Sequence, residues 1–261
     1  MEANLAICRE DRTVNDFRRA NSWGLTQPEM YCLDLVPLSY RRSVLDIGIG
    51  AGRTTGPLSE MFKRYIGVDY SPEMIQAAKT EFPGTELRVM DARRMALEQS
   101  VDCIMFSFNG IDCIPYEDRQ TVFTEVARLL VPGGYYIYST HNLHQRRTDA
   151  WLNHFWVKEL FRKRVYTSIP LVVNRLKHFR KQSNDESLGF AYVNDSAHSF
   201  DLRQVYVDIA KECEVLRRHG FDVLATIGNN KQIEGYDVDD NWVYIVAKMA
   251  SAEVPSGPAQ L

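Results

Sequence analysis

The sequence predicts an α/β fold with a doubly wound, mainly parallel sheet, on three observations. Short apolar segments alternate along the chain with segments of helical periodicity. The first apolar segment ends in an acidic residue followed by three alternating glycines, at residues 46–52. Acidic residues also end the next two apolar segments, at Asp69 and Asp91. Because parallel strands end at one edge of a sheet, these residues predict a ligand site at that edge.

The first half of the chain contains the alternating elements. We expect helical material over residues 13–40, where Pro28 suits the first turn of a helix ending near Val36. Five strands are expected at Ser43–Ile47, Arg64–Val68, Glu86–Val89, Val101–Ser107 and Gly134–Thr140. The helices between them are expected at Thr54–Phe62, Pro72–Glu81 and Tyr116–Leu130. Right-handed crossovers then place helices on both faces of the sheet.

The last quarter of the chain follows a different pattern. We expect a helix over Asp201–Gly220 and strands at Phe221–Ile227 and Trp242–Lys248. No helix separates these two strands, so they are predicted to pair antiparallel at one edge of the sheet. The predicted organisation is a helical cap at 1–40, one domain over 41–250 with an insertion at 141–200 that forms a substrate lid, and a disordered tail at 251–261.

Composition and charge narrow the function classes. The chain has 261 residues, 45% of them hydrophobic, and a net charge of −3, which does not favour nucleic-acid binding. Its five cysteines form no C-x-x-C pair, so neither a metal site nor a disulfide framework is expected. We read no signal peptide at the start of the sequence, and no apolar run reaches the roughly 18 residues of a membrane span. The expected location is a reducing one, the cytoplasm.

The glycine loop is the first part of the predicted ligand site. Gly48, Gly50 and Gly52 follow Asp46, and glycine allows a ligand to lie directly against the main chain. A helix starts after them, and its free N–H groups point toward the same place. Dinucleotide-binding loops carry a third glycine where this chain has Arg53, which counts against a nicotinamide or flavin cofactor without excluding it.

The tips of the second and third strands complete a nucleoside-shaped pattern. Asp69 lies 21 residues after Gly48 (69 − 48), the spacing at which an acidic residue accepts the hydroxyls of a ribose. Asp91 is placed to accept a hydrogen bond from an adenine amino group, with the adjacent backbone N–H of Ala92 at a ring nitrogen. Tyr70 and Met74 are candidates to cover the faces of the base.

These motifs resemble those of a known family. The segments that carry the resemblance are Val44–Gly52, Gly67–Met74, Val89–Ala92, Phe106–Asn109 and Leu130–Tyr138. They are similar to the class I S-adenosylmethionine-dependent methyltransferases of the small-molecule type. The resemblance implies a Rossmann-like sheet of seven strands whose last strand is antiparallel. It also implies that S-adenosylmethionine is the cofactor and S-adenosylhomocysteine the product.

The resemblance assigns roles to individual residues. It implies that Asp46 and the loop through Gly48, Gly50 and Gly52 hold the methionine portion of the cofactor. Asp69 with Tyr70 and Met74, and Asp91 with Ala92, are assigned to the ribose and adenine. The transferring methyl group is expected beside Phe106, Phe108 and Asn109.

The methyl acceptor is less constrained by the sequence. Residues 106–112 lack the Asn/Asp-Pro-Pro-Tyr/Phe segment of enzymes that methylate DNA bases or protein glutamine. His141, at the end of the fifth strand, and Asp112 are candidates for a general base, and a purely structural role for each stays open. The candidate acceptor-binding residues are Asn109, His141, Trp151, Tyr192, Asn194 and His198.

A basic stretch leaves further alternatives open. Residues 158–181 contain eight Lys or Arg and one acidic residue, which suits an anionic or carrier-bound substrate, RNA, or an ordinary solvated helix face. The prediction is methyl transfer to an oxygen or nitrogen of a small-molecule metabolite. The alternatives are an RNA or protein methyltransferase and a non-catalytic S-adenosylmethionine-binding protein. The sequence leaves the acceptor and the oligomeric state open.

Overall fold

The computed structural model describes residues 2–145, 184–185, 187–194, 202–228, 231–233 and 240–251. The helices are α1 Glu2–Cys8, α2 Asp11–Ala20, α3 Gln27–Asp34, α4 Thr55–Met61, α5 Pro72–Glu81, α6 Tyr116–Leu129 and α9 Ile209–Arg218, with short 3₁₀ turns η1 Asn21–Trp23, η2 Leu38–Tyr40, η3 Gly110–Cys113 and η4 Leu143–Gln145. The strands are β1 Ser43–Ile47, β2 Arg64–Asp69, β3 Leu87–Val89, β4 Val101–Phe106, β5 Leu130–Asn142, β6 Asn184–Asp185, β7 Phe190–Val193, β8 Gln204–Val207, β9 Phe221–Gly228, β10 Lys231–Ile233 and β11 Trp242–Met249.

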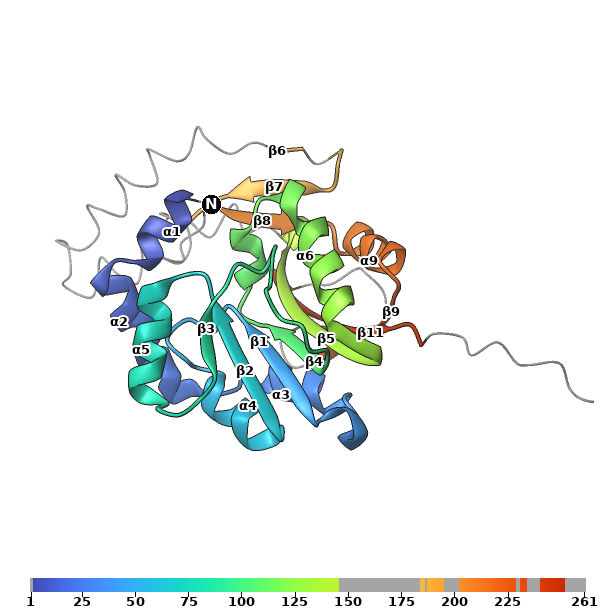
Figure 1. The fold of residues 1–261 in the computed structure, drawn as a ribbon. Helices are drawn as coiled ribbons and strands as arrows, with labels where there is room; N and C mark the ends of the chain where they lie inside the picture. Colours follow the sequence, from blue (N-terminus) through green and yellow to red (C-terminus); the bar gives the residue numbers. More distant parts are fainter. Residues whose placement is uncertain are drawn as a thin grey trace, which may run out of the picture.

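One sheet runs through the molecule in the order β10-β9-β11-β5-β4-β1-β2-β3 (Figure 1). Strands β3, β2, β1, β4 and β5 pair parallel, whereas β11 pairs antiparallel with both β5 and β9. The predicted doubly wound, mainly parallel sheet with an antiparallel last strand is therefore confirmed. The edge next to β9 is formed by the short strand β10.

Strand β5 is longer than the sequence predicts, and it carries a side branch. At one end of β5, Leu130 pairs with Val101 of β4. At the other end, His141 and Asn142 pair with β8. Strand β7 pairs antiparallel with β8 beside this extension. The residues described between 141 and 200 thus include strands that join the main sheet.

The prediction of a helix over Asp201–Gly220 is wrong in its first part, because the observed helix starts only at Ile209. Residues Gln204–Val207 form strand β8, because Val205, Tyr206 and Val207 are the β-branched and aromatic types that fit a sheet. The helix α9 starts only after Asp208, whose side chain accepts hydrogen bonds from the backbone N–H groups of Ala210 and Lys211. This N-cap marks the boundary that the apolar pattern alone hides.

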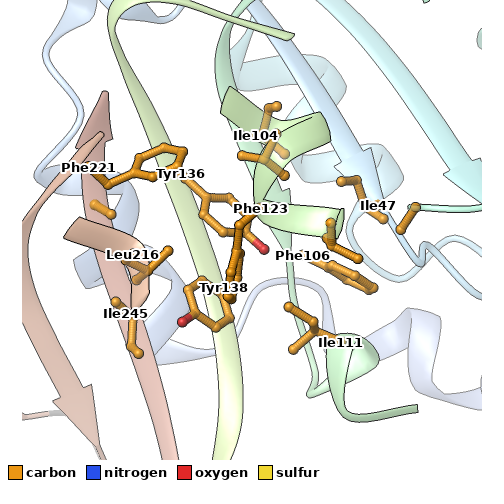
Figure 2. Packing of buried hydrophobic residues seen from close by; sticks show 14 of the residues in the cluster. Ile47, Ile104, Phe106, Ile111, Phe123, Tyr136, Tyr138, Leu216, Phe221 and Ile245 are labelled. Carbon is orange, nitrogen blue, oxygen red and sulfur yellow. The ribbon is translucent and has the colours of Figure 1, made fainter. Parts of the chain in front are cut away.

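Helices cover both faces of the sheet. On one face, α6 and α9 pack against strand residues such as Leu45, Ile104 and Tyr138. On the other face, α3, α4 and α5 pack against the alternate residues, including Val44, Met105 and Ile137. Figure 2 shows the first of these two cores, where Phe123 of α6 lies beside Tyr136 and Tyr138 of β5. The two tyrosine rings stack with centroids 4.8 Å apart.

The N-terminal helix α1 is attached to a segment far along the chain, just before β8. The side-chain amide of Asn4 donates to the carbonyl of Arg203 (2.8 Å) and its oxygen accepts from the Arg203 N–H (3.2 Å). In Figure 1, α1 and the strands β7 and β8 lie at the same end of the molecule. A search of the described residues finds no helix of the length and apolar character needed to cross a membrane.

Candidate functional site

The loop after β1 has a backbone that only glycine adopts readily. Gly48 and Gly50 have φ angles of +67° and +55°. A Cβ atom at Gly48 would lie 2.7 Å from the ring of Phe106, and one at Gly50 would lie 2.6 Å from the ring of Phe17. The main chain of the loop is therefore fitted closely between the end of β4 and helix α2.

Asp69, at the end of β2, holds this loop in place. One of its carboxylate oxygens accepts from the Gly50 N–H (2.9 Å) and the other from the Ser71 N–H (2.9 Å). A carboxylate has about four lone-pair positions, so each oxygen can accept another hydrogen bond from a ligand. Burial raises the pKa of Asp69 to about 6, and the backbone donors only partly offset this effect.

Asp91, at the end of β3, shares its carboxylate with a neighbour. Arg93 contacts both oxygens, at 2.6 Å for the shortest of these bonds, and also reaches Asp118 at 2.5 Å. Burial raises the pKa of Asp91, but the hydrogen bonds and charge of Arg93 outweigh it, so this pKa lies below its ordinary value. Asp91 is thus ionised, and its oxygens are already partly engaged.

A cavity of about 120 Å³ joins the tips of four strands. Ten residues predicted for the cofactor line it: Gly48, Gly50, Asp69, Tyr70, Met74, Asp91, Ala92, Phe106, Phe108 and Asn109. The wall also contains Cys8, Phe17, Leu202 and Gln204, which the sequence analysis did not select. No local spacing signals these four residues, because α1, α2 and the segment at 202–207 reach the cavity only through long-range packing. Met90 and Cys113 also line the cavity, and they lie next to the selected residues Asp91 and Asp112.

Two predicted cofactor residues lie behind the loop. Asp46 accepts from the hydroxyls of Thr54 (2.6 Å) and Tyr65 (2.8 Å), and burial raises its pKa to about 7. A Cβ atom at Gly52 would lie 2.7 Å from Phe82, which packs the loop against the end of α5. Neither Asp46 nor Gly52 is among the residues that line the cavity.

Arg53, which stands where dinucleotide-binding loops carry a third glycine, is held by several buried contacts. Its guanidinium forms two hydrogen bonds with the carboxylate of Glu29 in α3, at 2.5 and 2.8 Å. It also donates to the Ser107 hydroxyl (2.8 Å) and lies 4.2 Å from the ring centre of Phe108. Arg53 therefore connects the glycine loop with α3 and with the segment after β4.

Asp112 and His141, the predicted base candidates, form a buried pair beside the cavity. The Asp112 carboxylate lies 2.7 Å from Nδ1 of His141 and accepts hydrogen bonds from Arg119 (2.9 Å) and Thr140 (2.6 Å). The other ring nitrogen, Nε2, lies 3.0 Å from the side-chain amide nitrogen of Asn109. Asn109 lines the cavity, whereas Asp112 and His141 do not.

Two of the remaining acceptor candidates, Tyr192 and Asn194, are bonded to other parts of the chain. The Tyr192 hydroxyl donates to Glu117 (2.8 Å), and the side-chain amide of Asn194 donates to the Leu202 carbonyl (3.1 Å). Neither residue lines the cavity. Trp151 and His198, like the basic stretch at 158–181, lie outside the described residues. Within the described ranges, no group of three or more His, Cys, Asp or Glu is arranged to hold a metal ion.

The family comparison matches the region that builds this site. Residues 44–134 match the model of a family described as a methyltransferase domain. The chain is 37% identical over 101 residues to a trans-aconitate 2-methyltransferase of Azoarcus sp. (strain BH72), covering 38% of this chain and 39% of the relative. It is 34% identical over 114 residues to a malonyl-[acyl-carrier protein] O-methyltransferase of Marinomonas sp. (strain MWYL1), covering 41% of each. The matches thus span about two fifths of the length of these curated relatives.

The comparison of folds extends beyond this region. The CcbJ methyltransferase from Streptomyces caelestis superposes with a TM-score of 0.61 at 14% identity, over 86% of this chain and 89% of the other. A S-adenosylmethionine-dependent methyltransferase from Clostridium acetobutylicum ATCC 824 gives a TM-score of 0.56 at 14% identity, over 86% and 91%. At these identities the similarity concerns the fold alone.

Proposed function

We propose that the chain is a class I S-adenosylmethionine-dependent methyltransferase that transfers a methyl group from S-adenosylmethionine to a small molecule, because residues 44–134 match the model of a methyltransferase-domain family. The observation that carries this proposal is the cavity itself. It brings the glycine loop, Asp69 and the segment after β4 into one wall, although these residues are separated in the sequence.

The residues of the wall fit the cofactor. The free lone pairs of Asp69 are suited to the two ribose hydroxyls, and the glycine loop leaves room for the chain of the ligand against the backbone. Met74 and Tyr70 would cover the base beside Asp91 and Ala92. When bound, S-adenosylmethionine supplies a methyl group on a positively charged sulfur. The chain's part is to hold the acceptor in line with that methyl group and to exclude water with Phe106 and Phe108.

The acceptor is proposed to be an oxygen or nitrogen of a small metabolite. The curated relatives named above act, by their names, on trans-aconitate and on a malonyl-carrier protein, which supports a small or carrier-linked acceptor. Cys8 and Phe17 of the N-terminal helices also line the cavity, which is consistent with the proposed helical cap at 1–40. His141 stays a predicted base, held by Asp112 and separated from the cavity by Asn109.

Calorimetry tests the cofactor assignment. We expect S-adenosylmethionine and S-adenosylhomocysteine to bind at one site, and NAD and FAD not to bind. Tight binding of NAD or FAD in place of both adenosyl compounds would contradict the proposal. Binding of both without turnover, over a panel of alcohols, amines and carboxylic acids, would instead identify a non-catalytic binder.

A further inference from the structure

Two buried side-chain amides in the cavity wall have unpaired carbonyl oxygens. Asn109 is 3% exposed and Gln204 is 6% exposed, and both line the cavity. Within the described part of the chain, neither Asn109 Oδ1 nor Gln204 Oε1 has a hydrogen-bond partner. Since a buried polar oxygen without a partner is unfavourable, these two oxygens are suited to accept hydrogen bonds from a ligand.

The orientation of the Asn109 amide is determined by its neighbours. The Asp112 carboxylate lies 2.7 Å from Nδ1 of His141, which suits a proton on Nδ1. In that tautomer, the lone pair on Nε2 accepts from the Asn109 amide nitrogen at 3.0 Å. The oxygen Oδ1 of Asn109 must therefore point away from His141. His141 acts here as a positioning residue.

The two amides line the same cavity from two different elements. Asn109 has a φ angle of +56°, and its backbone N–H donates to the Ser139 hydroxyl at 2.8 Å. Gln204 lies two residues before Tyr206 on β8, so both side chains point to one face of the strand. The ring of Tyr206 stacks on His141 with centroids 4.4 Å apart. Through Tyr206 and His141, strand β8 and the segment that carries Asn109 are therefore in contact beside the cavity.

The charge of the wall adds a second constraint. Among the described residues that line the cavity, Asp69 and Asp91 are acidic, and there is no Lys, Arg or His. The nearby Arg53 is paired with Glu29. An anionic acceptor would meet the carbonyl oxygens of Asn109 and Gln204 here without a cationic side chain in the described wall.

We propose that Asn109 and Gln204 form a subsite for an amine, whose nitrogen is the methyl acceptor; this inference rests on the proposed function. A primary amine directs two N–H bonds at the two carbonyl oxygens and keeps its lone pair for the methyl carbon. A hydroxyl group offers only one such bond, and a carboxylate offers none. In the transfer, the nitrogen lone pair forms the new N–C bond. The S–C bond breaks with its electron pair left on sulfur, and the methylated ammonium releases one proton to water after it leaves the site.

Binding to the full-length chain saturated with S-adenosylhomocysteine tests this subsite without turnover. The probes are benzylamine, benzyl alcohol and benzoate, which share a ring and differ in donor groups, compared by calorimetry at mildly alkaline pH. We expect benzylamine to bind at least tenfold more tightly than benzoate, with benzyl alcohol between them. Benzoate that binds as tightly as benzylamine, or no measurable binding of benzylamine, overturns the subsite.

Variants then locate the selectivity. Gln204→Met keeps the length of the side chain and removes the oxygen, so we expect at least a tenfold loss of benzylamine affinity and a smaller loss for benzyl alcohol. Gln204→Glu restores acceptor oxygens and should recover benzylamine binding relative to Gln204→Met. The matched control is Gln120→Met, on the exposed side of α6, which should change neither affinity. Equal losses for all three probes in Gln204→Met would overturn the assignment.

The two proposals fail in distinguishable ways. If the wild-type chain does not bind S-adenosylhomocysteine, the proposed function itself is wrong. If it binds this compound and prefers benzoate, only the amine subsite is wrong. The methyl-transfer rate from S-adenosylmethionine to benzylamine, against that to benzyl alcohol, gives a second readout, with the same order expected.

Discussion

Asp69 combines two tasks in one buried carboxylate. It accepts the N–H groups of Gly50 and Ser71, which shapes the loop, and it retains lone pairs that face the cavity. The ionised form is required for both tasks, because a protonated carboxyl group has fewer free acceptor positions. Since burial raises its pKa to about 6, this residue titrates close to physiological pH.

Cofactor affinity is therefore expected to fall in mild acid. Asp69 is ionised above its pKa and loses its charge as the pH falls through about 6. We expect the dissociation constant of adenosine to rise by about tenfold between pH 7 and pH 5, measured by calorimetry. The control is 2′,3′-dideoxyadenosine, which lacks both ribose hydroxyls and should show a much weaker dependence. An equal dependence for both nucleosides would assign the effect to another group, such as Asp46.

The two roles of His141 predict different kinetics. His141→Ala should slow methyl transfer by at least tenfold and leave the S-adenosylhomocysteine dissociation constant within about twofold of wild type. If His141 positions Asn109, the variant loses its preference for benzylamine over benzyl alcohol. If His141 is a base, the variant methylates both acceptors more slowly and keeps its preference between them. Turnover at the wild-type rate would exclude both roles.

At the scale of elements, the Arg53–Glu29 pair joins α3 to the glycine loop. Glu29 also accepts from the Thr26 N–H (2.6 Å), and so completes the capping box at the start of α3. Burial raises the pKa of Glu29, but the hydrogen bonds and charge of Arg53 outweigh this, and the pKa lies below its ordinary value. The pair thus fixes a helix end and the ligand loop in one arrangement.

Removing one partner of this pair should be costly. In Arg53→Met the Glu29 carboxylate stays buried without its cation, so we expect the free energy of unfolding to fall by about 3–5 kcal/mol, measured by urea denaturation. The double variant Glu29→Gln, Arg53→Met should lose less than the sum of the two single variants. Arg18→Met, at an exposed position of α2, is the matched control and should stay near wild type. Additive losses would contradict the coupling.

At the scale of the whole molecule, the cavity is lined by segments that lie far apart in the sequence. Cys8 and Phe17 come from the N-terminal helices, and Gln204 from β8. Asn4 holds α1 against the backbone of Arg203, 199 residues away, and also contacts the Cys113 carbonyl at 3.4 Å. The N-terminal helices therefore have a defined attachment beside the cavity.

Loss of this attachment should loosen the cap. Asn4→Ala removes the two hydrogen bonds to the Arg203 backbone, and we expect about 1–3 kcal/mol less protection of the α1 amides in hydrogen exchange. The S-adenosylhomocysteine dissociation constant should rise in parallel. The control is Asn15→Ala, an exposed asparagine of α2. Unchanged protection and affinity in Asn4→Ala would show that α1 is held by other contacts.

The sequence by itself determined the alternating strands and helices over residues 43–129 and the acidic residues at the strand tips. Apolar periodicity and glycine spacing are local properties, and they predicted β1 at Ser43–Ile47 and α5 at Pro72–Glu81 with the bounds observed. They also identified the acidic tips Asp69 and Asp91, because parallel strands end together. The error at β8 arose because a four-residue strand next to a helix shares its apolar pattern, and only pairing with β5 and β7 distinguishes it.

Only the tertiary structure decided which polar groups are free to meet a ligand. Asp46, Asp91, Asp112 and His141 all carry chemistry in the sequence, yet each has partners that no local pattern reveals. Gln204 has no signal in the sequence at all, and it reaches the cavity because β8 extends the sheet beside β5. Hydrogen-bond satisfaction depends on neighbours brought together by folding, so sequence can name the candidates and only the packed molecule can select among them.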